Sequence, residues 1–557
     1  MPVRPPSPPS ADEDPKGRVS AGVTESVWTA THRPIRTRAL DGKETADVCV
    51  VGGGIAGLTT AYFLSISGRD VVVLEDGAIG SGETGRTTAH FTNAIDDRYG
   101  VIRDKHGLAA ARLAAQSHTK AIEAVASIVK DESIRCHLKR VDGYLFLHPT
   151  DKPKTLDDEL EACHEVGLPV DRVSSAPHFD SGPALRFPDQ LQLHILEYLA
   201  GLKRAIERHG GRIYTDTHVR FPEGKLMAND HAVKAGKTVI CTNAPVTTKL
   251  AIHAKQMAFR TYVIAAEVPR SVPQAMWWDT GDHDAQSPFP PYHYVRLQTF
   301  ADGRTMVISG GQDHKVGALG HVEVDPYDAL ESWTRERFPE MGDLAHRWSG
   351  EVFEPADHLA FIGAELVQRG RYLASGDSGN GMTHGTLAGL ILRDLILGRH
   401  SPYKDLYDPT RKHVRSAGAL LREPFGMVKR LGRYVTPGDV ASAADLAPGE
   451  GAVFGKPKPK AVYRDDEGKL HACSAICPHL KCVVAWNPRE RSFDCPCHGS
   501  RFTATGKVVC GPSNADLEEI DLDAKETGPE RGKHVRPGPG RGKRKARATK
   551  AVQHSDS

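Results

Sequence analysis

Two Cys–His pairs near the C-terminal end of the chain have the residue types and spacing of a metal centre. Cys477-x-His479 and Cys495-x-x-His498 are separated by fifteen residues, which suits two loops that approach one site from opposite sides. Two thiolates and two imidazoles are ligands for zinc or for an iron–sulfur cluster. Zinc fingers usually take Cys with Cys and His with His from each local element, whereas here each loop supplies one of each. The mixed pattern favours iron–sulfur chemistry over structural zinc.

The segment around these pairs closely resembles the Rieske family of 2Fe-2S proteins. The matching neighbours of the ligands are Pro478, Leu480, Pro496, Gly499, Ser500 and the later Gly511-Pro512. The resemblance implies a 2Fe-2S cluster with the two cysteines on one iron and the two histidines on the other. It also implies a disulfide between Cys482 and Cys497, as in the respiratory-complex branch. Rieske potentials of about −150 to +300 mV lie far above those of all-thiolate plant-type ferredoxins, so such a cluster accepts electrons readily.

The cysteine distribution agrees with a metal centre. Six of the ten cysteines fall between residues 473 and 510. In a chain without a secretory signal, such clustering favours metal binding over a disulfide framework. Cys473 and Cys510 match no ligand position, and we expect them to be ordinary thiols.

A second chemical motif lies near the N-terminal end, in the segment ADVCVVGGGIAGLTTAYFL. Gly52, Gly54 and Gly57 form a G-x-G-x-x-G pattern after a Val-rich strand. The first glycine permits a tight turn, the second lets a pyrophosphate approach the backbone, and the third permits close helix packing. Glu75 would end the next strand and bind the adenosine ribose. Residues 46–75 therefore predict a dinucleotide-binding βαβ unit.

Residues of about 45–400 resemble the D-amino-acid oxidase superfamily of FAD-dependent oxidoreductases. Besides the glycine motif, the matching segments are GSGETGRTTAHF, TVICTNAP at 238–245 and YLASGDSGNGMTHGT at 372–386. The resemblance implies bound FAD. Its further predicted contacts are Gly85, Thr87 and Thr88 along the FAD, and Gly376, Gly379 and Gly381 before a helix whose N-terminus would face the flavin. A simple helix cap is the alternative reading of the last three glycines.

The elements that position these motifs predict more than one domain, since 557 residues exceed a single core. We expect an α/β FAD-binding Rossmann-like domain with an inserted antiparallel-sheet substrate domain, followed by an all-β Rieske domain. The predicted boundaries are a disordered N-terminus at 1–25, the FAD-dependent oxidoreductase domain at 26–431 with the insertion around 140–200 and 255–355, the Rieske domain at 432–525, and a basic disordered tail at 526–557.

Composition limits the location and partners of the chain. Hydrophobic residues make up 39% and charged residues 25%, and no apolar stretch is long enough to span a bilayer. The N-terminal segment MPVRPPSPPSADEDPKGR has no apolar core, so we expect a cytoplasmic protein without a membrane span. Residues 531–550 hold nine Lys and Arg and no acid. Such a run favours a solvated tail over contact with nucleic acid.

Flavin and Rieske cluster together predict an electron relay, because a flavin takes two electrons and a Rieske cluster carries one. We expect an FAD-dependent oxidoreductase that oxidises a small substrate, an amine or amino acid by resemblance. The cluster would relay electrons to an unidentified acceptor protein, or from a donor protein in reverse flow. The alternative is an electron-transfer or redox-sensing protein without small-molecule turnover. A Rieske oxygenase is disfavoured, because its mononuclear iron needs two neighbouring His and no two of the 27 lie within six positions.

Substrate contacts are expected on the inserted sheet. In YHYVRL, strand alternation places Tyr292, Tyr294 and Arg296 on one face. Arg296 could bind a substrate carboxylate with both guanidinium nitrogens, and Arg260 is a second candidate. Either arginine could equally serve in an ion pair, and we predict no catalytic residue.

Overall fold

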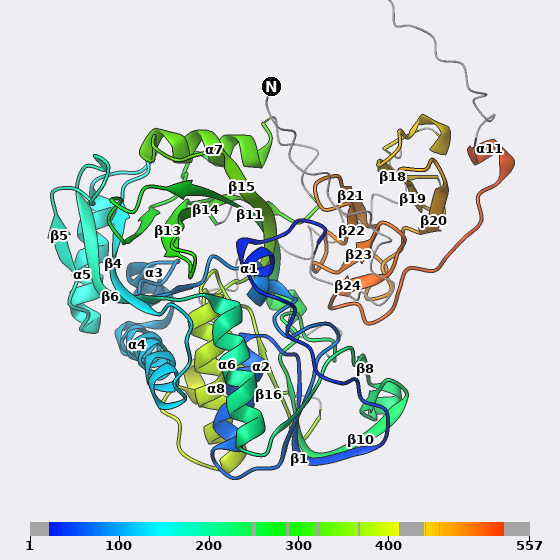
Figure 1. The fold of residues 1–557 in the computed structure, drawn as a ribbon, viewed down its shortest axis with the longest axis horizontal. Helices are drawn as coiled ribbons and strands as arrows, with labels where there is room; N and C mark the ends of the chain where they lie inside the picture. Colours follow the sequence, from blue (N-terminus) through cyan, green and yellow to red (C-terminus); the bar gives the residue numbers. More distant parts are fainter. Residues whose placement is uncertain are drawn as a thin grey trace, which may run out of the picture.

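The computed structural model describes residues 22–247, 252–285, 289–317, 324–365, 368–411, 439–440, 442–455 and 457–527. A large unit with two sheets lies beside a smaller β unit formed by the C-terminal part of the chain (Figure 1). The predicted disordered ends lie largely outside the described residues, as does the predicted boundary near residue 432. No helix in the described ranges is long and apolar enough to cross a bilayer.

The predicted βαβ unit forms the centre of the first sheet. β1 (Glu44–Val51) pairs in parallel with β2 (Val71–Leu74), and α2 (Ile55–Ser65) connects them. The strand order is β16-β17-β10-β1-β2-β7. The other strands are β7 (Arg212–Tyr214), β8 (Val219–Arg220), β9 (Met227–Ala228), β10 (His231–Ile240), β16 (Phe361–Ala364) and β17 (Arg371–Ser375).

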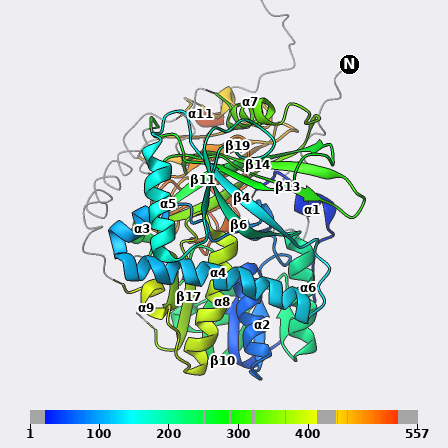
Figure 2. The same ribbon diagram turned by 90° about the vertical axis from the view of Figure 1, so that its left-hand side faces the viewer.

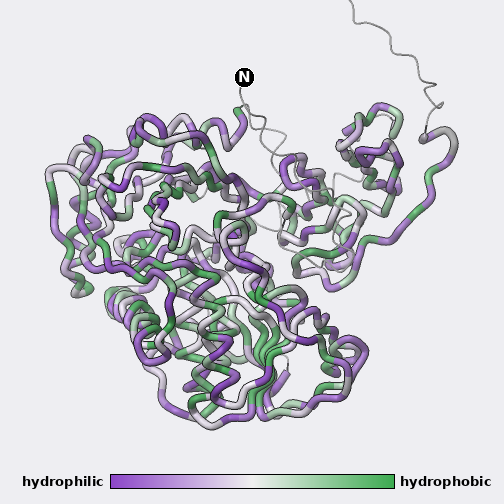
Figure 3. The backbone as a smooth tube through the Cα atoms, in the orientation of Figure 1, coloured by the Kyte–Doolittle hydropathy of each residue, from purple (hydrophilic) through white to green (hydrophobic). Residues whose placement is uncertain are grey.

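Helices cover this first sheet because its strands are apolar on both faces. All four residues of β2 are buried, and the strands of this sheet form the most continuous hydrophobic region in Figure 3. α2 packs against α6 (Ile195–Arg208) and α8 (Gly381–Leu397). The remaining helices of the large unit are α1 (Val27–Thr31), α3 (Tyr99–His106), α4 (Leu108–Asp131), α5 (Lys154–Val166), α7 (Pro326–Arg337) and α9 (Lys404–Tyr407).

The inserted sheet has the order β15-β11-β14-β13-β12-β4-β6-β3, with β5 beside β6 (Figure 2). Its strands are β3 (His90–Phe91), β4 (Lys139–Phe146), β5 (Asp171–Val173), β6 (Ala184–Gln192), β11 (Gln256–Val268), β12 (Met276–Asp279), β13 (Tyr294–Thr299), β14 (Thr305–Lys315) and β15 (Leu344–Pro355). All of its pairs are antiparallel, as predicted, except β4 and β12, which run parallel. These two strands are far apart in the chain, so no hairpin turn fixes their relative direction.

The C-terminal unit consists of two small antiparallel sheets. β18 (Gly451–Phe454), β19 (Lys460–Arg464) and β20 (Leu470–Ser474) form one, and β21 (Ala485–Asn487), β22 (Ser492–Asp494), β23 (Arg501–Thr503) and β24 (Val508–Cys510) form the other. α11 (Ala524–Thr527) follows them. Buried apolar residues such as Phe493 and Phe502 give the unit its own core. The predicted fold class, an α/β flavin-type domain with a sheet insertion and an all-β C-terminal domain, is confirmed.

The C-terminal unit packs against the β11–β15 edge of the inserted sheet (Figure 1). Arg86 of the large unit and Glu490 of the small one form an ion pair of 3.0 Å with side chains only 3% and 0% exposed. The Cys510 thiol donates to Glu351 of β15 at 3.2 Å. Burial raises the pKa of that carboxyl to about 8. The two units therefore share a polar interface with a buried ion pair.

Candidate active site and cluster-binding loops

The four predicted cluster ligands lie on two facing loops. Cys477 and His479 follow β20, whereas Cys495 and His498 follow β22. The two imidazole rings lie 5.1 Å apart, centroid to centroid, and nearly perpendicular. The hydrogen bond between the two thiols, with backbone N–H groups of the first loop, lowers the pKa of Cys477 to about 7 despite burial. The same hydrogen bond raises the pKa of Cys495, so the pair favours a thiolate, the form that binds iron, at Cys477.

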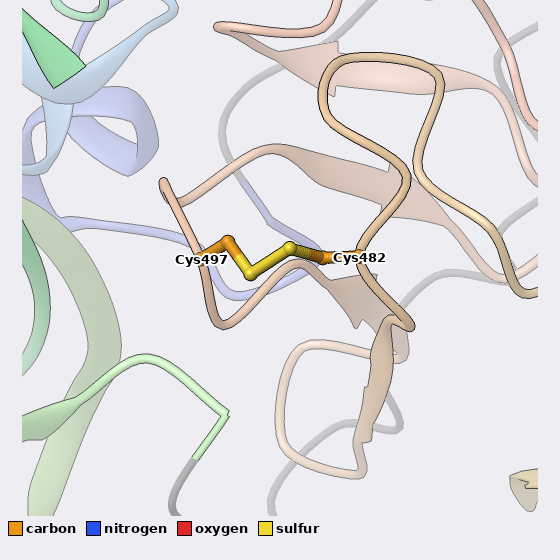
Figure 4. The surroundings of a disulfide bond; sticks show 2 residues. All are labelled: Cys482 and Cys497. Carbon is orange, nitrogen blue, oxygen red and sulfur yellow. A yellow bond between two sulfur atoms is a disulfide. The ribbon is translucent and has the colours of Figure 1, made fainter. Parts of the chain in front are cut away.

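A disulfide between Cys482 and Cys497 joins the two loops (Figure 4). Each loop is also braced by its own backbone hydrogen bonds. Cys477 N–H donates to Cys482 O at 2.9 Å, and Cys495 N–H donates to Ser500 O at 2.7 Å. The paired donors of a Cys₂His₂ set are thus held together by covalent and hydrogen bonds, and they fit a Rieske cluster.

Replacing both Cys482 and Cys497 by Ser should destabilise the cluster-binding unit by about 3 kcal/mol. The disulfide closes a loop of 15 residues. Without this cross-link the unfolded chain gains conformational entropy, which lowers the free energy of unfolding by about 3 kcal/mol. Unfolding in guanidinium chloride, monitored through the visible absorption of the cluster, measures this loss of stability. Reductant added to the wild-type protein should produce the same shift, and an unchanged midpoint for the double variant would contradict the prediction.

The glycine turn between β1 and α2 needs the small residues that the sequence places there. Gly52 has a φ of +111°, and a Cβ atom on it would lie 2.2 Å from Cys241 O. A Cβ atom on Gly57 would lie 1.9 Å from Gly52 O. Gly54 precedes the first turn of α2, whose N-terminus faces the cavity described next. This geometry suits a pyrophosphate against exposed backbone N–H groups.

A cavity of about 1640 Å³ runs from the glycine turn to the inserted sheet and the C-terminal unit. Most of the predicted FAD contacts line it: Gly52, Gly54, Glu75, Gly85, Thr87, Thr88, Gly376, Gly379 and Gly381. Gly57 instead serves helix packing. The Glu75 carboxylate accepts hydrogen bonds from Gly53 N–H and, at 3.0 Å, from Gly77 N–H. Burial raises the pKa of Glu75. The cavity has the lining and the size for a dinucleotide.

Thr84 lies beside the expected pyrophosphate site at the start of α2, and the sequence analysis did not identify it. Its hydroxyl accepts from Ile55 N–H at 3.1 Å and would lie 2.8 Å from a Cβ atom on Gly54. It lines the cavity at the N-terminus of α2. Its place inside the segment GSGETGRTTAHF, beside the predicted Gly85, was the available signal.

The predicted substrate residues separate into two groups. Tyr292 and Tyr294 line the cavity. Arg296 is fully buried, and its guanidinium donates to Ala89 O at 2.7 Å and to Leu193 O at 3.3 Å. Arg260 lies at the interface between the units, 3.9 Å from Glu351 and Asp494. Neither arginine is among the described residues that line the cavity.

The fold also assembles two His and a carboxylate that sequence spacing could not reveal. Ligand atoms of His148, Asp279 and His293 lie within 4.8 Å of one another. His293 Nδ1 pairs with Asp279 Oδ2 at 2.7 Å, and the other carboxylate oxygen accepts from two backbone N–H groups. None of the three occurs among the described residues of the cavity wall. Hydrogen bonding accounts for this cluster, and we assign no metal to it.

Comparison with known proteins identifies both units. Residues 47–395 match the FAD dependent oxidoreductase family, and residues 436–521 match the Rieske [2Fe-2S] domain. The chain belongs to the FAD-dependent oxidoreductase family. It also carries a Rieske domain, so FAD and a Rieske-type 2Fe-2S cluster are its cofactors.

Relatives extend this assignment. YhfW of Bacillus subtilis, described as a Rieske 2Fe-2S iron-sulfur protein, is 30% identical over 513 residues, covering 90% of this chain and 98% of the relative. The gamma-glutamylputrescine oxidoreductase of Escherichia coli is 26% identical over 412 residues, covering 68% of this chain and 90% of that protein. Glycine oxidase from Geobacillus kaustophilus shares the fold with a TM-score of 0.53 and 18% identity, covering 66% of this chain and 99% of that one. The chain is an FAD-dependent oxidoreductase.

Proposed function

We propose that the protein oxidises a small amine or amino acid at FAD and passes the electrons through the Rieske cluster to a separate acceptor protein. The proposed FAD contacts are the cavity glycines and threonines with Glu75. The proposed cluster ligands are Cys477, His479, Cys495 and His498. The relationship to an oxidoreductase of gamma-glutamylputrescine supports a nitrogen-containing substrate.

The observation that carries this proposal is the docking of the Rieske unit on the wall of the proposed FAD cavity. Cavity residues of the large unit, such as Ala244 and Val246, are joined in the same wall by Cys510 and Gly511 of the Rieske unit. A Cβ atom on Gly511 would lie 3.1 Å from Val246 Cγ1, so the two backbones are in close contact. The Rieske unit therefore forms part of the wall of the proposed FAD cavity.

His253 of the large unit lies directly against the proposed cluster histidines. Its ring centroid is 5.0 Å from that of His479 and 5.9 Å from that of His498. His253 is itself fixed, since Nε2 pairs with Pro245 O at 3.0 Å. The imidazole edge of the cluster site therefore faces the flavin-type unit, as a short electron path between the cofactors requires.

The chemistry supplied by the cofactors, when bound, is two-electron oxidation at FAD and one-electron transfer at the cluster. Conversion of an ammonium R₂CH–NH₃⁺ to an iminium R₂C=NH₂⁺ releases two electrons and two protons. The residues of this chain bind the substrate beside the glycine turn before α8 and separate it from water. They also hold the Rieske unit at the cavity wall, so that the electrons leave singly to a one-electron acceptor.

His479→Ala should remove the Rieske paramagnetic signal while FAD stays bound. In anaerobic mixing with a panel of amines and amino acids, a substrate should bleach the flavin of the wild-type protein before the cluster is reduced. In the variant the flavin should bleach without the second phase, because the imidazole that binds iron is absent.

His400→Ala is the matched control, since His400 is exposed beyond the end of α8. The control should retain both phases. Bleaching of the wild-type flavin with a permanently oxidised cluster would refute the relay, and zinc in place of iron would refute the cluster assignment. If no compound bleaches the flavin while a protein partner exchanges electrons with the cluster, the protein is an electron-transfer module instead.

A further inference from the structure

The end of the cavity beside α8 has an acidic and aromatic wall. Its residues are Asp96, Asp313, Trp278, Tyr292 and Tyr294. Asp96 lies against the glycine turn, because a Cβ atom on Gly379 would lie 1.9 Å from its Oδ2. The Tyr292 hydroxyl donates to the same carboxyl oxygen, and Asn380 Nδ2 donates to the other at 3.3 Å. Asp96 is therefore held in place at the expected substrate end.

Asp313 lines the same space from β14, where burial raises the pKa of its carboxyl and His293 opposes the increase, but no Lys or Arg among the described residues forms an ion pair with it. Its Oδ1 is buried with no hydrogen-bond partner among the described residues. A hydrogen bond with Thr261 engages the carboxyl from one side. The hydroxyl of the neighbouring Tyr294 pairs with Thr261 Oγ1 at 2.6 Å. A buried carboxyl oxygen of this kind is costly unless a ligand satisfies it.

Within the described part of the chain, the cavity lining offers no unpaired Lys or Arg to a substrate carboxylate. Among the described residues, the Lys and Arg that line it are Arg36, Arg86, Arg220, Arg491, Arg501 and Lys507. Each of them forms an ion pair with an Asp or Glu. At the acidic end, burial lowers the pKa of His90 to about 3, so its imidazole is neutral.

We propose that this cavity selects a cationic amine that has no carboxylate on the carbon bearing nitrogen. Its ammonium group is bound by Asp96 and Asp313. Its hydrocarbon part packs on Tyr292, Tyr294 and Trp278, whose rings also favour a nearby cation. An α-amino acid would bring its carboxylate to two acidic groups without a counter-ion. This inference rests on the proposed function and narrows its substrate class from amine or amino acid to amine.

The test compares compounds that differ only by a carboxylate. Pentylamine is paired with norleucine and phenethylamine with phenylalanine, using protein loaded with both cofactors. Calorimetry measures binding, and anaerobic bleaching measures flavin reduction. Each amine should bind at least tenfold more tightly than its amino acid. Asp313→Asn and Asp96→Asn should each weaken amine binding roughly tenfold to hundredfold, the range for hydrogen bonds to a charged group.

Asp302→Asn is the control, an exposed acid on the β13–β14 turn that should leave binding unchanged. Tighter binding of the amino acids, binding of neither compound, or unchanged amine affinity in both cavity variants would overturn the inference. A separate measurement tests the proposed electron relay, which is refuted if the flavin bleaches and the cluster stays oxidised. An amine that binds tightly and bleaches the flavin without reducing the cluster therefore supports this inference while refuting the relay.

Amine binding should weaken as the pH falls from 8 to 5. Burial raises the pKa of Asp96 to about 7, with Asp97 and Asp313 adding to the increase and Tyr292 and Arg98 opposing it. Burial likewise raises the pKa of Asp313 to about 6, opposed by Thr261 and His293. Below these values the carboxyls are neutral and lose their attraction for an ammonium. The dissociation constant should rise about tenfold per pH unit for each carboxyl protonated.

Asp313→Asn should remove the step near pH 6 and move the remaining step to below pH 7, because the charge of Asp313 contributes to the raised pKa of Asp96. This pH profile separates a direct electrostatic role from a purely structural one, because a structural defect would weaken binding equally at every pH. An amine affinity that is constant from pH 5 to 8 in the wild-type protein would contradict the assignment of the two carboxyls.

Discussion

Glu490→Gln should lower the free energy of unfolding by roughly 3–5 kcal/mol, the usual cost of leaving a buried charge without its partner. Glu490 Oε1 lies 3.0 Å from Arg86 Nη2, and Thr24 Oγ1 donates to it at 2.7 Å. Burial alone would raise the pKa of Glu490, but Arg86, Arg501 and the hydroxyl donors lower it overall. The carboxyl is therefore ionised, and its amide replacement would leave Arg86 buried without that counter-charge.

This loss should appear as looser docking of the Rieske unit, because Glu490 and Arg86 belong to different units. Denaturation followed separately by flavin fluorescence and by the visible circular dichroism of the cluster measures it. Glu223→Gln, whose side chain is 84% exposed, is the matched control and should change little. Since the pKa of Glu490 is lowered from 4.5, the stabilisation is present above that pH and lost as acid protonates the carboxyl. The difference in stability between the wild type and Glu490→Gln should therefore become smaller in acid. Equal unfolding midpoints at neutral pH would contradict a stabilising role for the Arg86–Glu490 pair.

Local sequence patterns were enough to predict the two cofactor-binding motifs. The tight turn at Gly52 and the close contact between the backbone at Gly57 and Gly52 O both lie within one βαβ unit. The spacing of the glycines in the sequence therefore determines this geometry. The Cys–x–His and Cys–x–x–His pairs behave similarly, because each pair lies on a single loop. Such features depend on few long-range contacts.

Contacts between distant segments were not predictable from the sequence. Arg86 and Glu490 are 404 residues apart, and neither lies in a motif that indicates its partner. Strand alternation predicted Tyr292, Tyr294 and Arg296 on one face, but β13 begins only at Tyr294, and the pattern could not show what covers that face further along the strand. There Arg296 lies under Trp28, with its guanidinium carbon 5.3 Å from the ring, and away from the cavity. The same limitation hid Asp96 and Asp313, which come from separate elements and meet only in the folded cavity wall.

The docked Rieske unit contributes to the wall of the flavin cavity and so affects the access of water to it. Cys510 and Gly511 close part of the cavity wall, so the small unit helps to exclude water as well as to bind the cluster. Loss of docking should therefore affect substrate oxidation and electron transfer together. A variant that loses only its cluster ligand should affect electron transfer alone, which gives the two kinds of variant different kinetic signatures.

Gly57→Ala should weaken the binding of FAD while the Rieske cluster is retained. The added Cβ atom would lie 1.9 Å from Gly52 O and 3.0 Å from Gly52 C, which are backbone atoms that cannot rotate away. α2 must then move away from the turn whose N–H groups face the cavity. Overpacking of this kind costs about 1–3 kcal/mol, or roughly a five- to hundred-and-fifty-fold loss of affinity if it falls on FAD binding.

The Rieske unit has a separate core, so its paramagnetic signal should remain unchanged when Gly57→Ala retains less flavin. Gly42→Ala is the matched control, because a Cβ atom there meets nothing within 4 Å. FAD content after dialysis, measured beside the signal of the reduced cluster, distinguishes a local effect from general misfolding. Wild-type FAD affinity in Gly57→Ala would show that α2 can shift without disturbing the backbone N–H groups of the glycine turn. Loss of both cofactors would show that the flavin-type unit and the Rieske unit fold as one, a result that the buried Arg86–Glu490 pair would then explain.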